Sequence, residues 1–514
     1  MLARATTFAL QGVDAVPVAV EADIHSGLPA FTIVGLPDAA VQESRERVRA
    51  ALVNSGFDFP LRRITVNLAP ADLRKAGPGF DLGLAAALLA ASGQITPESL
   101  AGRALCGELG LDGSLRPVRG AIVIADAARR AGCRGLVLPR DNESEAALVA
   151  GIDVTGADSL TQLVRDLTGE AELARHDCDA TALLATPLGG GHDMSDVRGQ
   201  HGAKRALEIA AAGGHNLLMI GPPGAGKSML ARRVPTILPP LSLEEALETT
   251  RVHSVAGLLG GRPLVTRRPF RAPHHSTSAP GLVGGGRGPS PGEVSLALNG
   301  VLFLDELSEF VRPALEALRQ PLEEGVVEIS RAQRAASFPA RFMLIAATNP
   351  CPCGHAGDAR RDCSCHPVAV ARHQSKLSGP LLDRIDLVIR VEMPTRGQLA
   401  DEKAESDSLA IRTRVVRARS VQARRLASCG RRCNAEMRAA QLRGLCDLDE
   451  SALGALADAR ERIGLSMRGH DRALRVARTI ADLAGSPRIL REHATEALSY
   501  RDHRGGRQLS GAAA

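Results

Sequence analysis

Apolar and polar positions alternate along residues 1–168 with two different periods. Short runs rich in β-branched and aliphatic residues predict strands, and longer runs with helical spacing of apolar residues predict helices. The turn residues Leu111–Ser114 separate two apolar runs and predict a hairpin. The predicted strands are Val16–Val20, Ala30–Val34, Arg63–Asn67, Ala104–Leu109 and Gly135–Leu138, and the predicted helices are Asp38–Asn54, Phe80–Ala91 and Ala121–Ala131. We therefore expect an α/β or α+β domain over residues 1–168.

The periodic pattern is lost over residues 169–195, which contain the glycine-rich stretch Pro187–Gly191 and are predicted to be a linker. Strand, loop and helix patterns return over residues 196–396. Residues 397–505 read as helical, with proline and glycine confined to the breaks between helices. The chain is thus expected to be an α/β multidomain protein with three folded parts, as a length of 514 residues also suggests.

Composition excludes several classes of protein. Hydrophobic residues make up 44% and charged residues 23%, which excludes a largely disordered chain. The longest apolar candidate, Leu82–Ala91, is much shorter than the roughly 20 residues of a membrane span. Ten cysteines without an apolar signal segment at the N-terminus predict reduced thiols or metal ligands. We expect a soluble cytoplasmic protein without a membrane partner.

Basic residues gather in the last quarter of the chain. Residues 401–514 hold 22 Lys and Arg against 15 Asp and Glu, whereas residues 1–400 hold 41 against 42. This excess fits either a surface that binds a polyanion or a solvated basic helix. The scarcity of aromatic residues (ten Phe, one Tyr and no Trp) argues against recognition of single strands by base stacking. The helical arginines are Arg412, Arg414, Arg417, Arg419, Arg424 and Arg425.

Residues 221–228 match the phosphate-loop pattern G-x-x-x-x-G-K-[ST], between an apolar strand at Leu217–Ile220 and a helix at Met229–Val234. In such a loop, backbone N–H groups surround the β-phosphate and the helix N-terminus favours negative charge. We expect Lys227 to reach the β- and γ-phosphates and Ser228 to bind Mg²⁺. The predicted ATP-binding residues are Gly221, Pro222, Pro223, Gly224, Ala225, Gly226, Lys227 and Ser228.

Two further predicted strands end in polar residues that suit ATP hydrolysis. The apolar run Val301–Leu304 is followed by Asp305, which can hold Mg²⁺, and by Glu306, which can act as general base on the attacking water. The strand Leu344–Thr348 ends at Asn349, which can orient the same water. A catalytic set of Lys227, Asp305, Glu306 and Asn349 is therefore predicted.

With these motifs the sequence resembles the AAA+ ATPases, in particular the magnesium-chelatase-related family that includes ComM and YifB. The resemblance covers nearly the whole chain and implies a homo-hexameric, DNA-dependent ATPase and helicase for branch migration in recombination, notably natural transformation. It implies an AAA+ core at residues 196–396 and a helical lid at residues 397–505. The segments that carry it are Gly221–Ser228, Arg271–Ser278, Gly292–Glu306, Ala347–Gly354 and Leu377–Asp386.

The resemblance also implies roles for further residues. Arg384 matches the arginine finger that reaches the γ-phosphate in a neighbouring subunit, a role suited to a planar guanidinium. In the lid, the segment Ser466–Arg472 resembles the nucleotide-sensing motif. Arg468, just after the cap Ser466, is the preferred sensor, and Arg472 is a second nucleotide-binding candidate. The segment Asp196–Gln200 resembles the part of the adenine pocket that precedes the phosphate loop.

Two basic segments are candidates for non-specific contacts with branched or single-stranded DNA, and the alternative for each is a mobile loop that binds no ligand. Residues 324–334 predict a hairpin with Arg331 and Arg334 near its tip, where related helicases carry a pore hairpin. The glycine-rich run Gly281–Gly288, with Arg287, resembles the other pore-facing insertion. Phosphate contacts by these arginines would give affinity with little sequence specificity.

Four cysteines in a short segment are candidate ligands of a structural Zn²⁺ ion. They form two C-x-C pairs, which are tighter than the usual C-x-x-C spacing, and a reduced cysteine-rich loop is the alternative. The four are Cys351, Cys353, Cys363 and Cys365.

The N-terminal 168 residues resemble a Lon protease domain, through the segments 106–118, 121–132 and 136–142. The position of the Lon nucleophile falls on Gly79 and that of its partner lysine on Ile122. Because neither residue can supply a nucleophile or an amine base, we expect a Lon-like scaffold without protease activity. It would instead help the chain to oligomerise or to contact DNA.

Two other functions stay open at this point. A magnesium-chelatase motor would remodel a partner in tetrapyrrole synthesis, and a protein remodeller would act on other proteins. The N-terminal domain argues against the first. A failure of DNA to alter ATP hydrolysis would favour either of them over a DNA motor.

Overall fold

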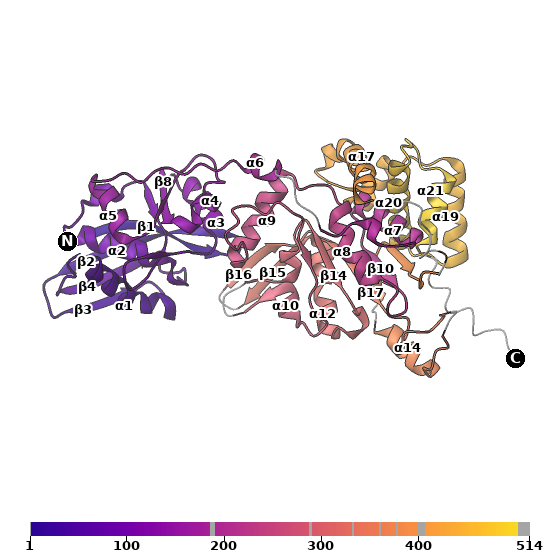
Figure 1. The fold of residues 1–514 in the computed structure, drawn as a ribbon, viewed down its shortest axis with the longest axis horizontal. Helices are drawn as coiled ribbons and strands as arrows, with labels where there is room; N and C mark the ends of the chain where they lie inside the picture. Colours follow the sequence, from indigo (N-terminus) through magenta and orange to yellow (C-terminus); the bar gives the residue numbers. More distant parts are fainter. Residues whose placement is uncertain are drawn as a thin grey trace.

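The computed structural model describes residues 2–185, 191–286, 290–331, 334–358, 361–376, 379–395, 397 and 407–501. These residues form an elongated molecule, with one sheet at the N-terminal end, a second sheet in the middle and a group of helices at the other end (Figure 1). The chain is therefore a mixed α/β protein of several parts, as the sequence predicts. None of the described helices is long and apolar enough to cross a membrane.

The N-terminal sheet has seven strands in the order β3-β4-β2-β1-β5-β8-β9. The antiparallel pair β1 and β2 forms its centre, and β5, β8 and β9 continue from β1 as parallel neighbours. The strands are β1 (Leu2–Gln11), β2 (Asp14–His25), β3 (Ala30–Val34), β4 (Arg63–Ala69), β5 (Arg103–Leu105), β8 (Gly135–Pro139) and β9 (Asp153–Ala157), with a separate hairpin of β6 (Glu108–Leu109) and β7 (Leu115–Arg116). The hairpin at Leu111–Ser114 is thus confirmed.

The helices of this part are α1 (Ala39–Asn54), α2 (Asp81–Ala91), α3 (Ala121–Arg130), α4 (Arg140–Ala146) and α5 (Leu160–Thr168). All eleven residues of α2 are buried, which explains why the helix is apolar after its first residue. That residue, Asp81, is a buried carboxylate that pairs with Arg47 (2.7 Å). The predicted strand Ala104–Leu109 is divided, because the chain leaves the sheet at Gly107. There the Gly107 carbonyl accepts a hydrogen bond from Leu82 N–H at the start of α2, and Gly107 N–H donates to the Gly79 carbonyl.

The central sheet has five parallel strands in the order β11-β14-β17-β10-β18. Every residue of β14 and β17 is buried, as expected for parallel strands covered on both faces. The strands are β10 (Leu217–Ile220), β11 (Phe270–Arg271), β14 (Val301–Leu304), β17 (Met343–Thr348) and β18 (Leu387–Arg390). The helices are α7 (His201–Gly213), α8 (Lys227–Ile237), α9 (Leu243–Ala256), α10 (Ala279–Val283), α11 (Glu293–Leu296), α12 (Arg312–Ala317), α13 (Arg319–Glu324), α14 (Pro367–Ser375) and α15 (Gly379–Leu382).

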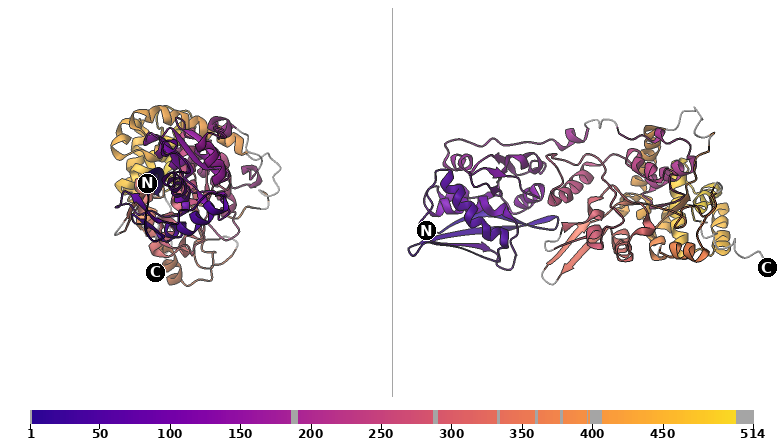
Figure 2. Two further views of the ribbon diagram at one scale, coloured as in Figure 1. Left: turned by 90° about the vertical axis from the view of Figure 1, so that its left-hand side faces the viewer. Right: turned by 60° about the horizontal axis from the view of Figure 1, so that its bottom comes forward.

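Two small hairpins form separate two-stranded sheets beside the central sheet. They are formed by β12 (Gly284–Gly285) with β13 (Ser290–Pro291) and by β15 (Val326–Arg331) with β16 (Arg334–Pro339). Figure 2 shows the β15–β16 hairpin extending toward the N-terminal sheet. The turn between β1 and β2 meets it there, since a Cβ atom at Gly12 would lie 3.3 Å from the Ser337 carbonyl oxygen.

The N-terminal and central parts share a buried apolar contact. One hydrophobic cluster contains Ile122 of α3 together with Leu241, Ala246 and Leu264 of the central part. The short helix α6 (Ala180–Ala185), within the segment predicted to be a linker, lies beside α9 (Figure 1). The boundaries at residues 168, 195 and 396 stay predictions. Residues 186–190 of the predicted linker, and residues 398–406 and 502–505 of the last predicted domain, lie outside the described residues.

The C-terminal helices pack against α7 and α8 of the central part through a second large apolar cluster. A buried polar network fixes them to one another. The Asp482 carboxylate, with a fully buried side chain, accepts hydrogen bonds from Arg425 (2.8 Å), Arg478 (3.1 Å) and Asn434 (2.9 Å). The helices are α17 (Ser408–Leu426), α18 (Ala439–Leu445), α19 (Glu450–Ile463), α20 (Met467–Leu483) and α21 (Arg491–Ser499).

We predict that Asp482→Ala lowers the free energy of unfolding of the helical part by about 3 kcal/mol, because it leaves two buried guanidinium groups without their carboxylate. Urea titration followed by circular dichroism measures the change. The matched control is Asp458→Ala, which removes an exposed carboxylate from α19 and should change stability by less than about 0.5 kcal/mol. Equal effects of the two substitutions would contradict the network's role.

Candidate functional site

The phosphate loop lies at the carboxyl end of β10 and leads directly into α8, as the sequence predicts. Gly226 forms the N-cap of α8 with a left-handed backbone (φ +90°), which favours glycine. A Cβ atom at Gly224 or Gly226 would meet no other atom within 4 Å, so open space lies over the loop. At Gly221, by contrast, a Cβ atom would lie 2.1 Å from the Val391 carbonyl oxygen. The loop therefore combines a tight base with an open side that fits a phosphate group.

Lys227 is the buried cation of this loop. Its ammonium group donates to the carbonyl oxygens of Gly221 (2.6 Å) and Pro222 (2.9 Å) and to Asn349 Oδ1 (3.1 Å). Burial lowers the pKa of Lys227, and the carboxylates of Asp305 and Glu306 oppose this shift. The ammonium group thus joins the end of β10 to the end of β17.

Ser228 and Asp305 form the candidate magnesium pair. Ser228 Oγ donates to Asp305 Oδ2 at 2.5 Å, so the hydroxyl of α8 and the carboxylate after β14 lie side by side. A hydroxyl and a carboxylate oxygen are the ligand types that Mg²⁺ prefers, with water and phosphate oxygens completing the set. The residues present fit a magnesium ion bound with ATP.

Glu306 follows Asp305 in a strained, left-handed conformation (φ +51°) that turns the chain sharply after β14. Its carboxylate lies 3.1 Å from Nδ1 of His275, on the loop that follows β11. Sequence reasoning placed Arg271–Ser278 among the family segments but assigned no role to His275. The signal in the sequence was the adjacent pair His274 and His275. It could be connected with Glu306 only by knowing that β11, which precedes the pair, lies next to β14.

Asn349 is held from two sides at the end of β17. Its side-chain oxygen accepts from Lys227, and its backbone carbonyl lies 3.1 Å from His373 Nε2 of α14.

The segment predicted for the adenine pocket also reaches the loop, since Gln200 donates to the Ala225 carbonyl (3.1 Å) and to the Glu392 carbonyl (2.6 Å). Four segments that are far apart in the sequence therefore contact residues 221–228. They contribute Gln200, Asp305, Asn349 and Val391.

The candidate arginine finger, Arg384, lies in the connection between α15 and β18. The Arg384 guanidinium forms an ion pair with Glu323 of α13 and is 11% exposed. The guanidinium is therefore held in an intrachain pair, which would have to open before Arg384 could reach a nucleotide on a neighbouring chain.

The two nucleotide-sensing candidates on α20 differ in their surroundings. Arg468 is exposed in the first turn, after the cap Ser466. Arg472 is mostly buried, with Nε 3.9 Å from Asp386 Oδ1. Burial raises the pKa of Asp386, but contacts with His215, Arg472 and the Asn216 backbone outweigh it and lower this pKa to about 2. Arg472 thus lies at the junction between α20 and the central sheet.

The two predicted DNA-contacting segments lie side by side. A Cβ atom at Gly284 of β12 would approach Ile329 of β15 to 3.0 Å, so the two hairpins pack together. Arg331 and Arg334 are paired backbone positions at the end of the β15–β16 ladder, next to its turn. Their side chains, and the whole of Arg287, lie outside the described part of the structure.

The basic helix α17 is only partly available to a polyanion. Arg414 pairs with Glu208, Arg419 donates to the Ala211 carbonyl and Arg425 binds Asp482. These arginines fix α17 to α7 and α20. The predicted polyanion-binding surface of α17 is therefore reduced to its exposed arginines. These are Arg412, Arg414, Arg417 and Arg424.

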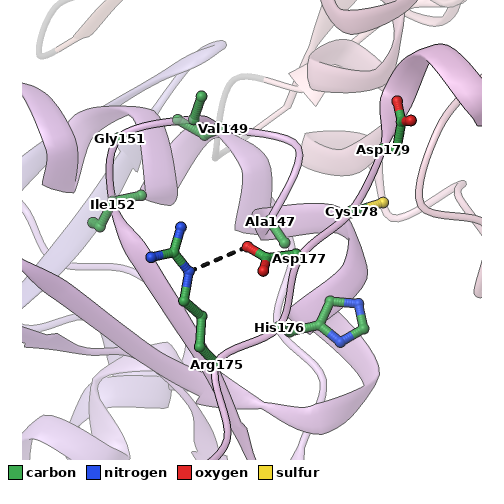
Figure 3. A pocket seen from close by; sticks show the side chains of 10 residues that line it. Ala147, Val149, Gly151, Ile152, Arg175, His176, Asp177, Cys178 and Asp179 are labelled. Carbon is green, nitrogen blue, oxygen red and sulfur yellow. Dashed lines mark hydrogen bonds and ion pairs between the residues drawn. The ribbon is translucent and has the colours of Figure 1, made fainter.

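A pocket of about 390 Å³ lies on the N-terminal part, between the α4–β9 turn and residues 175–179 (Figure 3). Arg175 in its wall pairs with Asp177 (3.1 Å) and Asp153 (2.6 Å). The pocket contains none of the residues predicted for nucleotide, metal or DNA binding. Gly79 and Ile122, the positions expected to match the Lon nucleophile and its partner lysine, offer neither a nucleophile nor an amine. Gly79 has no side chain, and the side chain of Ile122 is buried.

Three family models match the N-terminal, central and C-terminal parts of the chain. The family model described as magnesium chelatase, subunit ChlI, matches residues 193–399, that of subunit ChlI of Mg-chelatase matches residues 20–142, and that of the ChlI C-terminal region matches residues 405–501. These matches indicate ATP and Mg²⁺ as the ligands and an ATPase as the class of enzyme.

The chain is also similar to three relatives over nearly their full length. It is 49% identical to the uncharacterized protein Rv2897c of Mycobacterium tuberculosis, over 97% of this chain and 98% of the relative. The identity is 46% to the uncharacterized protein YifB of Escherichia coli and 44% to the competence protein ComM of Haemophilus influenzae, each over 96% of both chains. The chain therefore belongs to the ComM and YifB family of magnesium-chelatase-related AAA+ proteins.

Proposed function

We propose that this protein is an ATP-hydrolysing, ring-forming AAA+ motor that acts on DNA, as a branch-migration helicase in recombination or natural transformation. The observation that supports the proposal most directly is the convergence of Lys227, Ser228, Asp305, Glu306 and Asn349 at one edge of the central sheet. The name of the relative ComM, a competence protein, supports DNA as the substrate.

Each residue of this group has a task in hydrolysis. Lys227 would release the loop carbonyls and bind the β- and γ-phosphate oxygens, which are stronger acceptors because they are charged. Ser228 and Asp305 would hold the Mg²⁺ that neutralises the phosphates. Glu306 would accept a proton from the attacking water, and Asn349 would orient that water.

A homo-hexameric ring would complete the site, with Arg384 acting on the nucleotide of the neighbouring chain. For this, Arg384 would exchange its partner Glu323 for a γ-phosphate, and assembly would thus control hydrolysis. The C-terminal helices would act as the lid, with Arg468 and Arg472 sensing the nucleotide. The N-terminal part would be a Lon-like domain without protease activity. Its contact with the β15–β16 hairpin supports a place near the DNA path.

The test is the rate of ATP hydrolysis without DNA, with single-stranded DNA and with a four-way junction, each at low and high salt. We expect strong stimulation by DNA that falls as salt rises, because the contacts are to phosphates. A rate that no DNA alters would contradict the DNA motor and favour a chelatase-type or protein-remodelling partner, in keeping with the matched family models.

We predict that Lys227→Ala weakens ATP binding by about two orders of magnitude, since it removes charged hydrogen bonds to phosphate. Glu306→Gln should leave binding intact and slow hydrolysis by at least about 100-fold. Fluorescent-nucleotide binding and phosphate release measure the two steps. Normal turnover by Glu306→Gln would show that another group is the general base.

For the arginine finger, we predict that Arg384→Ala slows hydrolysis about a thousandfold and inhibits rings that also contain wild-type chains. Glu323→Ala is the matched control, because it breaks the same intrachain pair but keeps the guanidinium. Hydrolysis by Glu323→Ala should persist. If both substitutions inactivate equally, the pair matters for folding and the finger assignment is wrong.

The contact of His275 with Glu306 leads to a further prediction. If the imidazole restrains the carboxylate in the nucleotide-free chain, His275→Ala should raise the basal hydrolysis rate, by up to about fivefold for a half-exposed pair. DNA stimulation should fall in the same variant. His274→Ala is the comparison variant, because it removes the ring that packs on His275 (centroids 4.0 Å apart) but leaves the imidazole that pairs with Glu306. A reduced basal rate in His275→Ala would mean that the imidazole supports hydrolysis instead.

A further inference from the structure

The four cysteines after β17 are brought to one point by the fold. Cys351 Sγ lies 3.3 Å from Cys353 Sγ and 3.6 Å from Cys363 Sγ, and the last two sulfurs are also 3.6 Å apart. All four sulfur atoms, including that of Cys365, lie within 4.8 Å of one another. Four sulfurs around a zinc ion at about 2.3 Å would be separated by about 3.8 Å in a tetrahedron. The cluster therefore has the dimensions of a tetrahedral thiolate site.

The surroundings also suit a metal. Backbone N–H groups donate to two of the sulfurs, from Cys353 to Cys365 Sγ (3.3 Å) and from Ala356 to Cys351 Sγ (3.2 Å). Such bonds stabilise thiolates and orient them. The two nearby histidines have other partners, since His355 pairs with Asp358 and His366 caps α14. The donor set is therefore four sulfurs, without a histidine.

This cluster is attached to the nucleotide site at two points. Gly354, between the two cysteine pairs, packs on the phosphate loop so closely that a Cβ atom would lie 2.5 Å from Pro223 Cδ. The chain then passes through the second pair into α14, where His373 returns to the Asn349 carbonyl (3.1 Å). The segment thus leaves Asn349, contacts the phosphate loop and comes back to Asn349.

We propose that Cys351, Cys353, Cys363 and Cys365 bind one Zn²⁺ ion, and that this site braces Asn349 and the phosphate loop for hydrolysis. The metal site stands on the cluster alone, whereas the bracing rests on the proposed ATPase function. Removing the metal would free residues 350–358 and 361–366, so that Asn349 and Pro223 lose the contacts that position them.

Zinc content tests the first half. The full chain, purified under reducing conditions, should contain one zinc ion per chain by mass spectrometry, and cobalt should give the absorption of a tetrahedral tetrathiolate site. Cys363→Ser/Cys365→Ser should lose the metal, while Cys429→Ser, outside the cluster, should keep it. A wild-type chain that contains no zinc and takes up neither zinc nor cobalt would overturn the metal site, whatever its ATPase rate.

ATP hydrolysis tests the second half. We expect the zinc-free variant to keep the circular dichroism of the wild type and to hydrolyse ATP about tenfold more slowly. Gly354→Ala should keep its zinc, because all four cysteines remain. It should also slow hydrolysis, because its Cβ atom would press on Pro223 and because the left-handed backbone at this position (φ +86°) favours glycine. Wild-type rates in both variants would overturn the bracing. A wild-type chain that binds zinc but hydrolyses no ATP would instead contradict the proposed function.

Discussion

Burial of the Lys227 ammonium group at the carboxyl edge of the central sheet is the constraint on which the candidate site depends. Parallel strands place all their carboxyl ends on one edge, so the residues after β10, β14 and β17 meet there. A buried cation needs compensation, and here it comes from loop carbonyls, from Asn349 and from the nearby Asp305 and Glu306. A nucleotide would replace these internal partners with phosphate oxygens.

The same edge is in contact with segments that lie well outside the phosphate loop. His275 reaches Glu306 from the loop after β11, and the cysteine cluster reaches Pro223 and Asn349. The β12–β13 hairpin that follows His275 packs on the β15–β16 hairpin, which in turn meets the N-terminal sheet. Chain connectivity and packing thus link the candidate DNA-contacting segments to Glu306. The proposed motor would need such a link, since hydrolysis and movement must influence each other.

Sequence reasoning found the parts of this structure that depend on local pattern. The buried strands β10 and β14 are apolar throughout, β17 is apolar up to Thr348, and α2 is apolar after Asp81. The phosphate loop has a fixed spacing. The strands β1 and β9 were not predicted, because their short side chains and mixed polarity give no clear alternation of apolar and polar positions. β1 is a strand because β2 pairs with it along its whole length. The contact of His275 with Glu306, like the ion pairs of Arg384 and Arg414, forms between elements that are distant in the sequence. No local pattern specifies which elements become neighbours.

The most direct test of the account is the displacement of a strand from a mobile four-way junction by the purified chain, with ATP and magnesium. The account predicts that the wild type resolves the junction, and that Glu306→Gln binds it in the presence of ATP without resolving it. Resolution by the Glu306→Gln variant, or failure of an ATP-hydrolysing wild type to resolve any branched DNA, would contradict it.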